Sequence, residues 1–231
     1  MIFRQLFDSE SSTYSYLIAG NNAGGEALLI DPVVEHSEQY VRLIEELDLK
    51  LVLAVDTHIH ADHVTALGTL RERTNCATAM GEMTRTECVS VHFRDGERLN
   101  IDGLELQALY TPGHTDDSYS FMMPDRVFTG DTLLIRGTGR TDFQNGDAAE
   151  QYDSLFGRLL KLPEHTLVYP AHDYNGMTVS TIGEELRYNP RLQVARKAEY
   201  VALMDGLNLA DPRLMDVAVP ANRSCGLRPA A

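Results

Sequence analysis

Four apolar runs of this chain lead directly to a histidine or an aspartate, and this recurrence restricts the possible folds more than any other feature. The first run, residues 51–55, leads into Thr57-His58-Ile59-His60-Ala61-Asp62-His63. The other three lead into Pro112-Gly113-His114, Thr129-Gly130-Asp131 and Pro170-Ala171-His172. Short apolar runs rich in branched residues are typical of buried strands, and strand ends on a rigid sheet can hold ligands precisely. The sequence therefore predicts strand ends that converge on a metal ion.

The side chains in this pattern are those that bind first-row metal ions. Neutral imidazole and carboxylate groups suit zinc, iron and related ions, and the glycines at 113 and 130 permit tight turns that aim the following side chain. An isolated histidine is more often a surface group, which is how we interpret His36, His92 and His165. That interpretation does not suit three histidines and one aspartate within six residues.

The ligand-type residues can be shared between metal ions in more than one way. By count alone, His58, His60, His114 and Asp131 can hold one ion. A second ion can then be held by a shared Asp131 together with Asp62, His63 and His172. A hydroxide bridging two zinc-type ions would attack a thioester, so the count favours a two-metal hydrolase.

Strands and helices alternate along the chain. The hydrophobic pattern predicts strands at 2–7, 13–19, 26–31, 51–55, 76–80, 87–92, 104–110, 118–123, 126–129 and 166–169. It predicts helices at 37–48, from just after His60 to Arg73, and at 147–161, and a mostly helical segment from about 181. Two successive groups of strands and helices indicate an α+β fold with two sheets packed together and helices outside. We expect a single domain over residues 1–231, with the helical segment of about 181–231 packed on it.

Composition restricts the possible binding partners and the cellular compartment of the protein. The net charge of −14 argues against a nucleic-acid partner, and no apolar stretch approaches the roughly 18 residues that span a membrane. Cys76, Cys88 and Cys225 are odd in number and lack a CxxC spacing, so we expect three free thiols. Together with an N-terminus that lacks a signal-peptide pattern, this predicts a cytoplasmic protein that binds neither nucleic acid nor membrane.

The histidine motifs as a set resemble the metallo-β-lactamase superfamily. The H-x-H-x-D-H run, the later single histidine, the Gly-Asp pair and the last histidine match its signature, and their order resembles the glyoxalase II branch. This resemblance covers nearly the whole chain. It implies a four-layer αββα sandwich with the metal at one edge.

The residues flanking the motifs resemble the persulfide dioxygenases of that branch. The matching stretches are 135–144 (IRGTGRTDFQ), 170–181 (PAHDYNGMTVST), 189–192 (NPRL) and 218–222 (AVPAN). The resemblance implies one ferrous iron per chain, held by His58, His114 and Asp131. His60, Asp62, His63 and His172 then orient the ligands or hydrogen-bond bound water. We prefer the resemblance to the ligand count, because that count is common to the whole superfamily.

The resemblance also implies an activity and a substrate site. It predicts an oxidoreductase of sulfide oxidation that converts glutathione persulfide, dioxygen and water to glutathione and sulfite, and that forms a homodimer. The alternative is a dinuclear zinc-type glutathione thioester hydrolase. Tyr174, Arg191 and Arg140 are the candidates for substrate binding, although a structural salt bridge is the other interpretation of both arginines. Thr138 stands where some relatives carry a cysteine, and we expect this difference to change rate or regulation.

Overall fold

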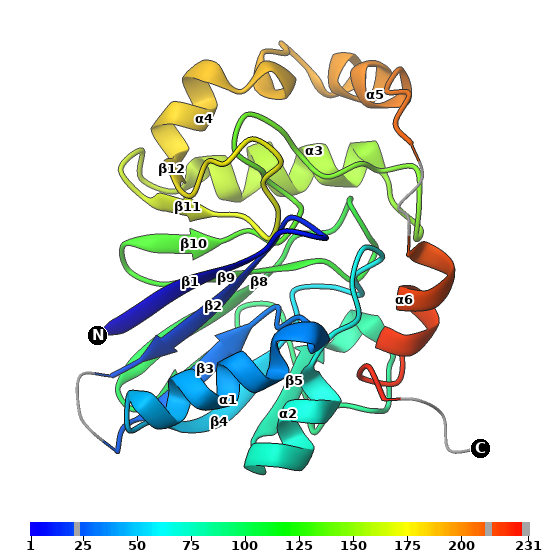
Figure 1. Cartoon of the computed structure of the whole chain (residues 1–231). Coiled ribbons are helices and arrows are strands. Elements are labelled where there is room, and N and C mark those ends of the chain that lie inside the picture. Colours follow the sequence, from blue (N-terminus) through cyan, green and yellow to red (C-terminus); the bar gives the residue numbers. More distant parts are fainter. Residues whose placement is uncertain (21–23, 211–213, 228–231) are drawn as a thin grey trace. The chain divides into compact units, whose positions relative to one another are not determined.

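The computed structural model describes residues 1–20, 24–210 and 214–227, which divide into two compact units (Figure 1). The first unit comprises the described residues of 1–93, 98–106 and 214–227, and the second comprises residues 94–97 and 107–210. Each unit combines strands with helices, which confirms the predicted α+β class. The prediction of one domain over the whole chain stays a prediction.

A six-stranded sheet forms the frame of the first unit. Its strands follow chain order: β1 (Ile2–Asp8), β2 (Thr13–Ala19), β3 (Glu26–Ile30), β4 (Lys50–Val55), β5 (Ala77–Gly81) and β6 (Val91–Phe93). The strands from β1 to β3 are antiparallel, and those from β3 to β6 are parallel. Parallel neighbours require crossover connections, and α1 (Ser37–Glu46) and α2 (Leu67–Thr74) lie in two of these.

The core of the first unit lies between this sheet and its helices. Leu17 and Leu29, on neighbouring strands, belong to the same buried cluster as Tyr40 and Ile44 of α1 and Leu70 of α2. Tyr40 and Ile44 are four residues apart, so they lie on one face of the helix. This packing fixes the sheet whose β4 delivers the chain to the first histidine motif.

The second unit is built on the strands β8 (Leu104–Tyr110), β9 (Tyr119–Met122), β10 (Arg126–Phe128), β11 (Leu167–Tyr169) and β12 (Ser180–Thr181). With β7 (Arg98–Ile101), these strands form a sheet in the order β12-β11-β10-β9-β8-β7, and the boundary between the units passes through β8. The helices α3 (Ala148–Gly157), α4 (Ile182–Tyr188) and α5 (Lys197–Asp205) share a buried cluster with Val127 and Val168 of the sheet.

The helices in the described part of the chain are short. The longest, α1 and α3, have 10 residues each, and 3₁₀ turns lie at Val34–His36, Glu82–Thr84, Leu159–Lys161 and Pro190–Leu192. Within the described ranges, no helix has the length and apolar character needed to cross a membrane.

The predicted elements differ from the observed ones at several places. The helix expected from His60 begins only at Leu67, because residues 59–66 form a loop held by side-chain hydrogen bonds. The strands β7 and β12 were not predicted, and the strand expected at 87–92 is the shorter β6. The helical segment from 181 divides between the units: α4 and α5 lie in the second, whereas α6 (Met215–Asn222) lies in the first.

The prediction of three free thiols is wrong for two of the cysteines. Cys88 and Cys225 form a disulfide with a Cα–Cα distance of 5.8 Å, and only Cys76 remains a buried thiol. The two bonded residues are separated by 137 positions. Sequence spacing alone carries no sign of a pairing over that distance, because the fold brings the two residues together.

Candidate metal centre

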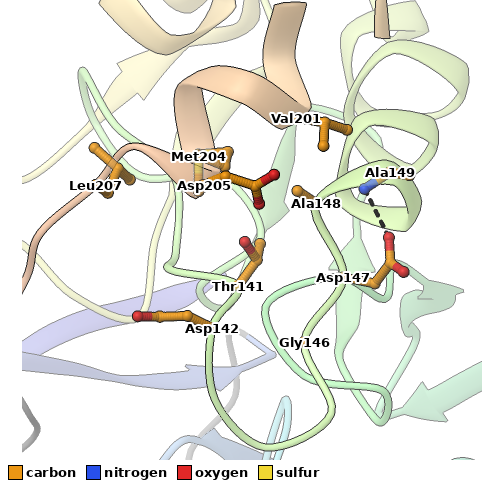
Figure 2. Close-up of a pocket in the computed structure, with 10 residues that line it drawn as sticks. All are labelled: Thr141, Asp142, Gly146, Asp147, Ala148, Ala149, Val201, Met204, Asp205 and Leu207. Carbon is orange, nitrogen blue, oxygen red and sulfur yellow. Dashed lines mark hydrogen bonds between the residues drawn. The ribbon is translucent and has the colours of Figure 1, made fainter. Parts of the chain in front are cut away.

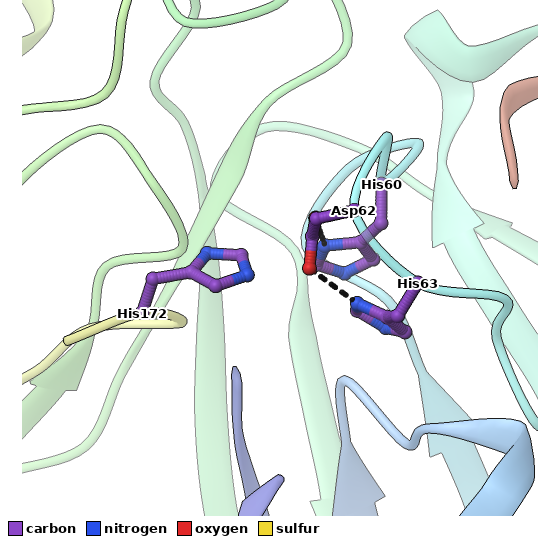
Figure 3. A group of neighbouring side chains, drawn as sticks. All are labelled: His60, Asp62, His63 and His172. Carbon is purple, nitrogen blue, oxygen red and sulfur yellow. Dashed lines mark hydrogen bonds and ion pairs between the residues drawn. The ribbon is translucent and has the colours of Figure 1, made fainter. Parts of the chain in front are cut away.

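Three imidazole rings lie close together in the first unit, on the loop that follows β4. The rings of His58 and His60 are 4.1 Å apart between centroids, and those of His60 and His63 are 4.3 Å apart. All three histidines are buried. Asp62 lies beside them and contacts His63 (Figure 3). The H-x-H-x-D-H run therefore brings its ligand-type side chains together within this unit, and their roles at a metal ion stay predictions.

One nitrogen of each ring is held by a neighbouring oxygen. Thr57 Oγ1 lies 2.9 Å from His58 Nδ1, and Asp62 Oδ2 lies 2.9 Å from His63 Nδ1. His60 Nε2 lies 3.1 Å from an oxygen of Asp31. Metal-binding histidines are oriented in this way, through the ring nitrogen that does not bind the metal. The loop thus presents its imidazoles in fixed orientations.

Asp31 also contacts this cluster, and it was not among the predicted site residues. Its buried carboxylate accepts hydrogen bonds from the backbone N–H of Thr57 at 2.7 Å and from its hydroxyl at 3.1 Å. Burial raises the pKa of Asp31 to about 6, although His58 and the Thr57 hydrogen bond oppose the rise. Asp31, Asp56 and His60 also offer ligand-type atoms within 4.8 Å of one another. The available signal was the position of Asp31 at the end of a predicted strand.

The second unit gathers the remaining ligand-type residues around Asp131. His172 Nδ1 lies 2.6 Å from Asp131 Oδ1, and His114 Nε2 lies 3.6 Å from Asp131 Oδ2. His114 Nδ1 donates to the carbonyl of Arg140 at 2.7 Å, which orients the imidazole. His172, also drawn in Figure 3, and Asp131 are buried, whereas His114 is partly exposed. Each histidine thus contacts a different oxygen of one carboxylate.

Glycines shape the turns that aim these side chains. Gly113 and Gly130 have φ values of +133° and +52°, which confirms the tight turns expected from the sequence. A Cβ atom on Gly113 would lie 2.3 Å from the Cα of Gln151. Both the backbone conformation and the close approach therefore require glycine immediately before His114.

The candidate substrate residues have different surroundings. Arg140 forms a bidentate ion pair with Asp142, at 2.6 and 2.8 Å, and its charge is thereby compensated. Arg191 donates to the carbonyl and hydroxyl oxygens of Thr138, and burial lowers its pKa. Tyr174 is 68% exposed. The substrate roles of all three remain predictions, but only Arg140 shows the salt bridge that was the alternative interpretation.

A cavity of about 420 Å³ also lies in the second unit (Figure 2). One of its carboxylates, Asp147, caps α3 by accepting from the N–H of Ala149 at 2.7 Å. The acidic part of its lining does not suit an anionic peptide such as glutathione. The lining residues are Thr141, Asp142, Gly146, Asp147, Ala148, Ala149, Val201, Met204, Asp205 and Leu207.

Buried imidazoles and carboxylates on short loops suit a divalent first-row metal ion. Such ions accept neutral nitrogen and anionic oxygen ligands, and both kinds are present in each unit. The donors are also held by hydrogen bonds from neighbouring groups, as a metal site requires. The chain therefore carries His/Asp groups that fit a metal ion.

Known proteins match this chain over most of its length. The family model described as the metallo-beta-lactamase superfamily matches residues 9–88 and 89–172. The persulfide dioxygenase ETHE1 of Mus musculus, named as mitochondrial, is 43% identical over 99% of this chain and 90% of its own length. A hydroxyacylglutathione hydrolase of Cronobacter sakazakii is 37% identical, but over 69% of this chain and 62% of its own length.

A solved structure agrees with the sequence comparison. The crystal structure of ETHE1 from Myxococcus xanthus has a TM-score of 0.95 and 55% identity, and the match covers 98% of this chain and all of that one. The predicted metallo-β-lactamase fold and the predicted family are thereby confirmed. The chain belongs to the metallo-beta-lactamase superfamily and, within it, to the persulfide dioxygenase family.

Proposed function

We propose that this chain is a persulfide dioxygenase that converts glutathione persulfide, dioxygen and water to glutathione, sulfite and two protons. Both sulfur atoms of the persulfide are recovered, one in the thiol and one in sulfite, and dioxygen is the oxidant. The observation that carries the proposal is similarity to persulfide dioxygenases over almost the whole chain, against a partial match to the hydrolase.

We further propose that His58, His114 and Asp131 hold one ferrous iron per chain. Two histidines and one carboxylate are the ligand set of many non-haem iron oxygenases. When bound, ferrous iron supplies a redox-active centre with open coordination positions for substrate and oxygen. The contacts of His58 with Thr57 and of His114 with Arg140 are both made through Nδ1. They support this assignment because they orient each ring through one nitrogen and leave Nε2 for the metal ion.

The remaining polar residues position these ligands. His172 contacts Asp131 Oδ1 and so fixes the orientation of the carboxylate. His60 is held by Asp31, and His63 by Asp62, so the loop that carries His58 keeps its shape. No cysteine is needed as a nucleophile, which agrees with a single thiol that is buried in the core.

For substrate binding we propose Arg191 and Tyr174, with Arg140 as the weaker candidate. Glutathione is anionic, so a chain with a net charge of −14 needs a local cation to hold it. Arg191 donates to neutral oxygens of Thr138, whereas Arg140 is compensated by Asp142. Tyr174 lies parallel to the ring of His172, at 6.1 Å between centroids, and carries an exposed hydroxyl-bearing side chain.

The second candidate is the dinuclear glutathione thioester hydrolase. It is favoured by the residues that a second ion would use, since His63 and Asp62 are in contact and His172 contacts Asp131. The two candidates differ in metal stoichiometry and in the need for dioxygen.

Metal content and oxygen uptake together test the proposal. Protein purified without oxygen is expected to hold about one iron per chain and to consume dioxygen with glutathione persulfide. His114→Ala should abolish uptake, whereas His165→Ala, at an exposed histidine, should leave it unchanged. About two zinc-like ions per chain, with thioester hydrolysis and no oxygen uptake, would establish the hydrolase instead.

We also propose a homodimer, a single domain formed by the two units, and a cytoplasmic location. The mammalian relatives are named as mitochondrial, so cell fractionation is the test of location. Light scattering tests the dimer, which would have twice the chain mass of 25.7 kDa. One cooperative unfolding transition seen by several probes would support a single domain.

A further inference from the structure

Asn222 is the last residue of α6, and its side-chain hydrogen bonds go to the loop of residues 56–66 that carries His58, His60 and His63. This segment is called the histidine loop below. Its Nδ2 donates to the carbonyl oxygens of His60 and His63, both at 2.9 Å. Its Oδ1 accepts from the N–H of Thr65 at 2.8 Å. A primary amide offers two donors and an acceptor, so this buried side chain is used completely.

The histidine loop depends on these bonds because it has little regular structure of its own. β4 ends at Val55 and α2 begins at Leu67. Buried carbonyl groups outside helices and sheets need other donors, and Asn222 supplies them at the two histidines that flank Asp62. The backbone position of this loop therefore depends on a residue more than 150 positions away in sequence.

The segment that carries Asn222 is itself anchored in the first unit. The Cys88–Cys225 disulfide ties it down three residues later, and Thr86 Oγ1 donates to the carbonyl of Arg223 at 2.6 Å. A Cβ atom on Gly226 would lie 2.0 Å from the carbonyl oxygen of Thr65, so the segment approaches the loop closely. Asn222 is thus presented on a fixed support.

We propose that Asn222 is a positioning residue of the metal centre, acting through the backbone of the loop that carries His58, His60 and His63. This inference rests on the proposed function only in requiring that the loop help to hold a metal ion. It also gives a role to the 218–222 stretch, which the sequence resemblance marked without explaining.

Asn222→Asp tests the proposal with a minimal change of shape. The variant keeps an acceptor for Thr65 but replaces the two N–H donors with a carboxylate oxygen facing two carbonyl groups. Titration of the metal-depleted full chain with Co²⁺ alone should show affinity reduced about 10–100-fold, the usual effect of losing a group that orients ligands. The visible absorption bands of bound Co²⁺ should change as well, because they report ligand geometry.

Thr86→Val is the matched control. It removes a hydrogen bond to the same C-terminal segment, at Arg223, without touching the histidine loop. We expect lower stability of the metal-free chain from both variants, but reduced Co²⁺ affinity from Asn222→Asp alone. If Asn222→Asp does not fold, Asn222→Ala provides the same loss of donors without a new charge.

The outcomes separate this inference from the proposed function. Wild-type affinity and absorption bands in a folded Asn222 variant would refute the positioning role and leave the enzyme assignment standing. Equal loss of affinity in Thr86→Val would also refute it, because the effect would then be general destabilisation. A wild-type chain that binds no Co²⁺ would refute the metal centre itself.

Discussion

Gly139 is the position where one added methyl group should disturb His114 and Asp131 together. Its N–H donates to the carbonyl of Asp131 at 2.6 Å. A Cβ atom there would lie 2.3 Å from that carbonyl oxygen and 2.8 Å from Cγ and Nδ1 of His114. Ordinary contacts begin at 3.4 Å, so the carbonyl must move by about 1 Å and the imidazole by about 0.6 Å in a packed interior.

The expected cost of Gly139→Ala follows from these displacements. Overpacking of this kind lowers the free energy of unfolding by about 1–3 kcal/mol, and catalytic constellations tolerate errors of only about 0.5 Å. We therefore expect oxygen uptake and metal affinity to fall by at least about tenfold, the lower end of the range for disturbed ligand orientation. Chemical denaturation of the metal-free variant should show the loss of stability separately.

Gly137→Ala is the control for this prediction. The same substitution two residues earlier places a Cβ atom 3.8 Å from that of Leu134, which is an ordinary contact. It should leave metal affinity and oxygen uptake near wild-type values. If Gly139→Ala behaves like Gly137→Ala in both assays, the close packing around His114 is not what sets the ligand geometry.

Other perturbations test the disulfide, an acidic group and the two arginines. Cys88→Ser with Cys225→Ser should lower the free energy of unfolding by roughly 3–5 kcal/mol, because the bond closes a long loop; an unchanged urea midpoint would contradict this. Burial raises the pKa of Asp8, but hydrogen bonds from Ser11 and His36 outweigh burial and hold this pKa below 3.8. The ionised Asp8 carboxylate therefore stabilises the fold fully above pH 3.8, and this contribution is lost as the pH falls through the lowered pKa. Asp8→Asn should therefore lose less stability on acidification below pH 3.8 than the wild type. Arg191→Gln should raise KM for glutathione persulfide about tenfold or more, whereas Arg140→Gln should mainly lower the free energy of unfolding. A KM of the Arg191→Gln variant equal to that of the wild type would exclude Arg191 from the substrate site.

Local sequence patterns predicted most of the fold. Four strands lie within one residue of their predicted ranges, namely β2, β3, β4 and β8. They were predictable because runs of apolar residues, and the alternation of apolar with polar residues, reflect the burial of a strand. The prediction of a helix from His60 was wrong, because helical periodicity does not show which groups hydrogen-bond to the backbone. In residues 59–66 the carbonyl groups of His60 and His63 accept from the side chain of Asn222, and a contact over such a separation leaves no periodic signal.

The candidate site was predictable where ligands share a loop or follow a strand. The H-x-H-x-D-H run and the Gly-Asp pair predicted ligand-type residues after strands, and His58, His60 and His63 lie close together after β4 while Asp131 follows β10. Their roles as metal ligands stay predictions. The same strand-end signal was present at Asp31, and counting it would have added that residue. The disulfide had no comparable signal, because its two cysteines belong to segments that only the tertiary fold joins.

The arginines show why the role of a charged side chain is harder to infer from sequence than that of a metal ligand. A metal ligand needs a particular side chain at a strand end, so residue type and position carry most of the information. An arginine can instead reach several partners, and its role depends on which one compensates its charge. Arg140 and Arg191 both lie in stretches that resemble the same family, yet one contacts a carboxylate and the other contacts neutral oxygens. Only tertiary contacts distinguish them, and they make Arg191 the stronger candidate for holding an anionic substrate.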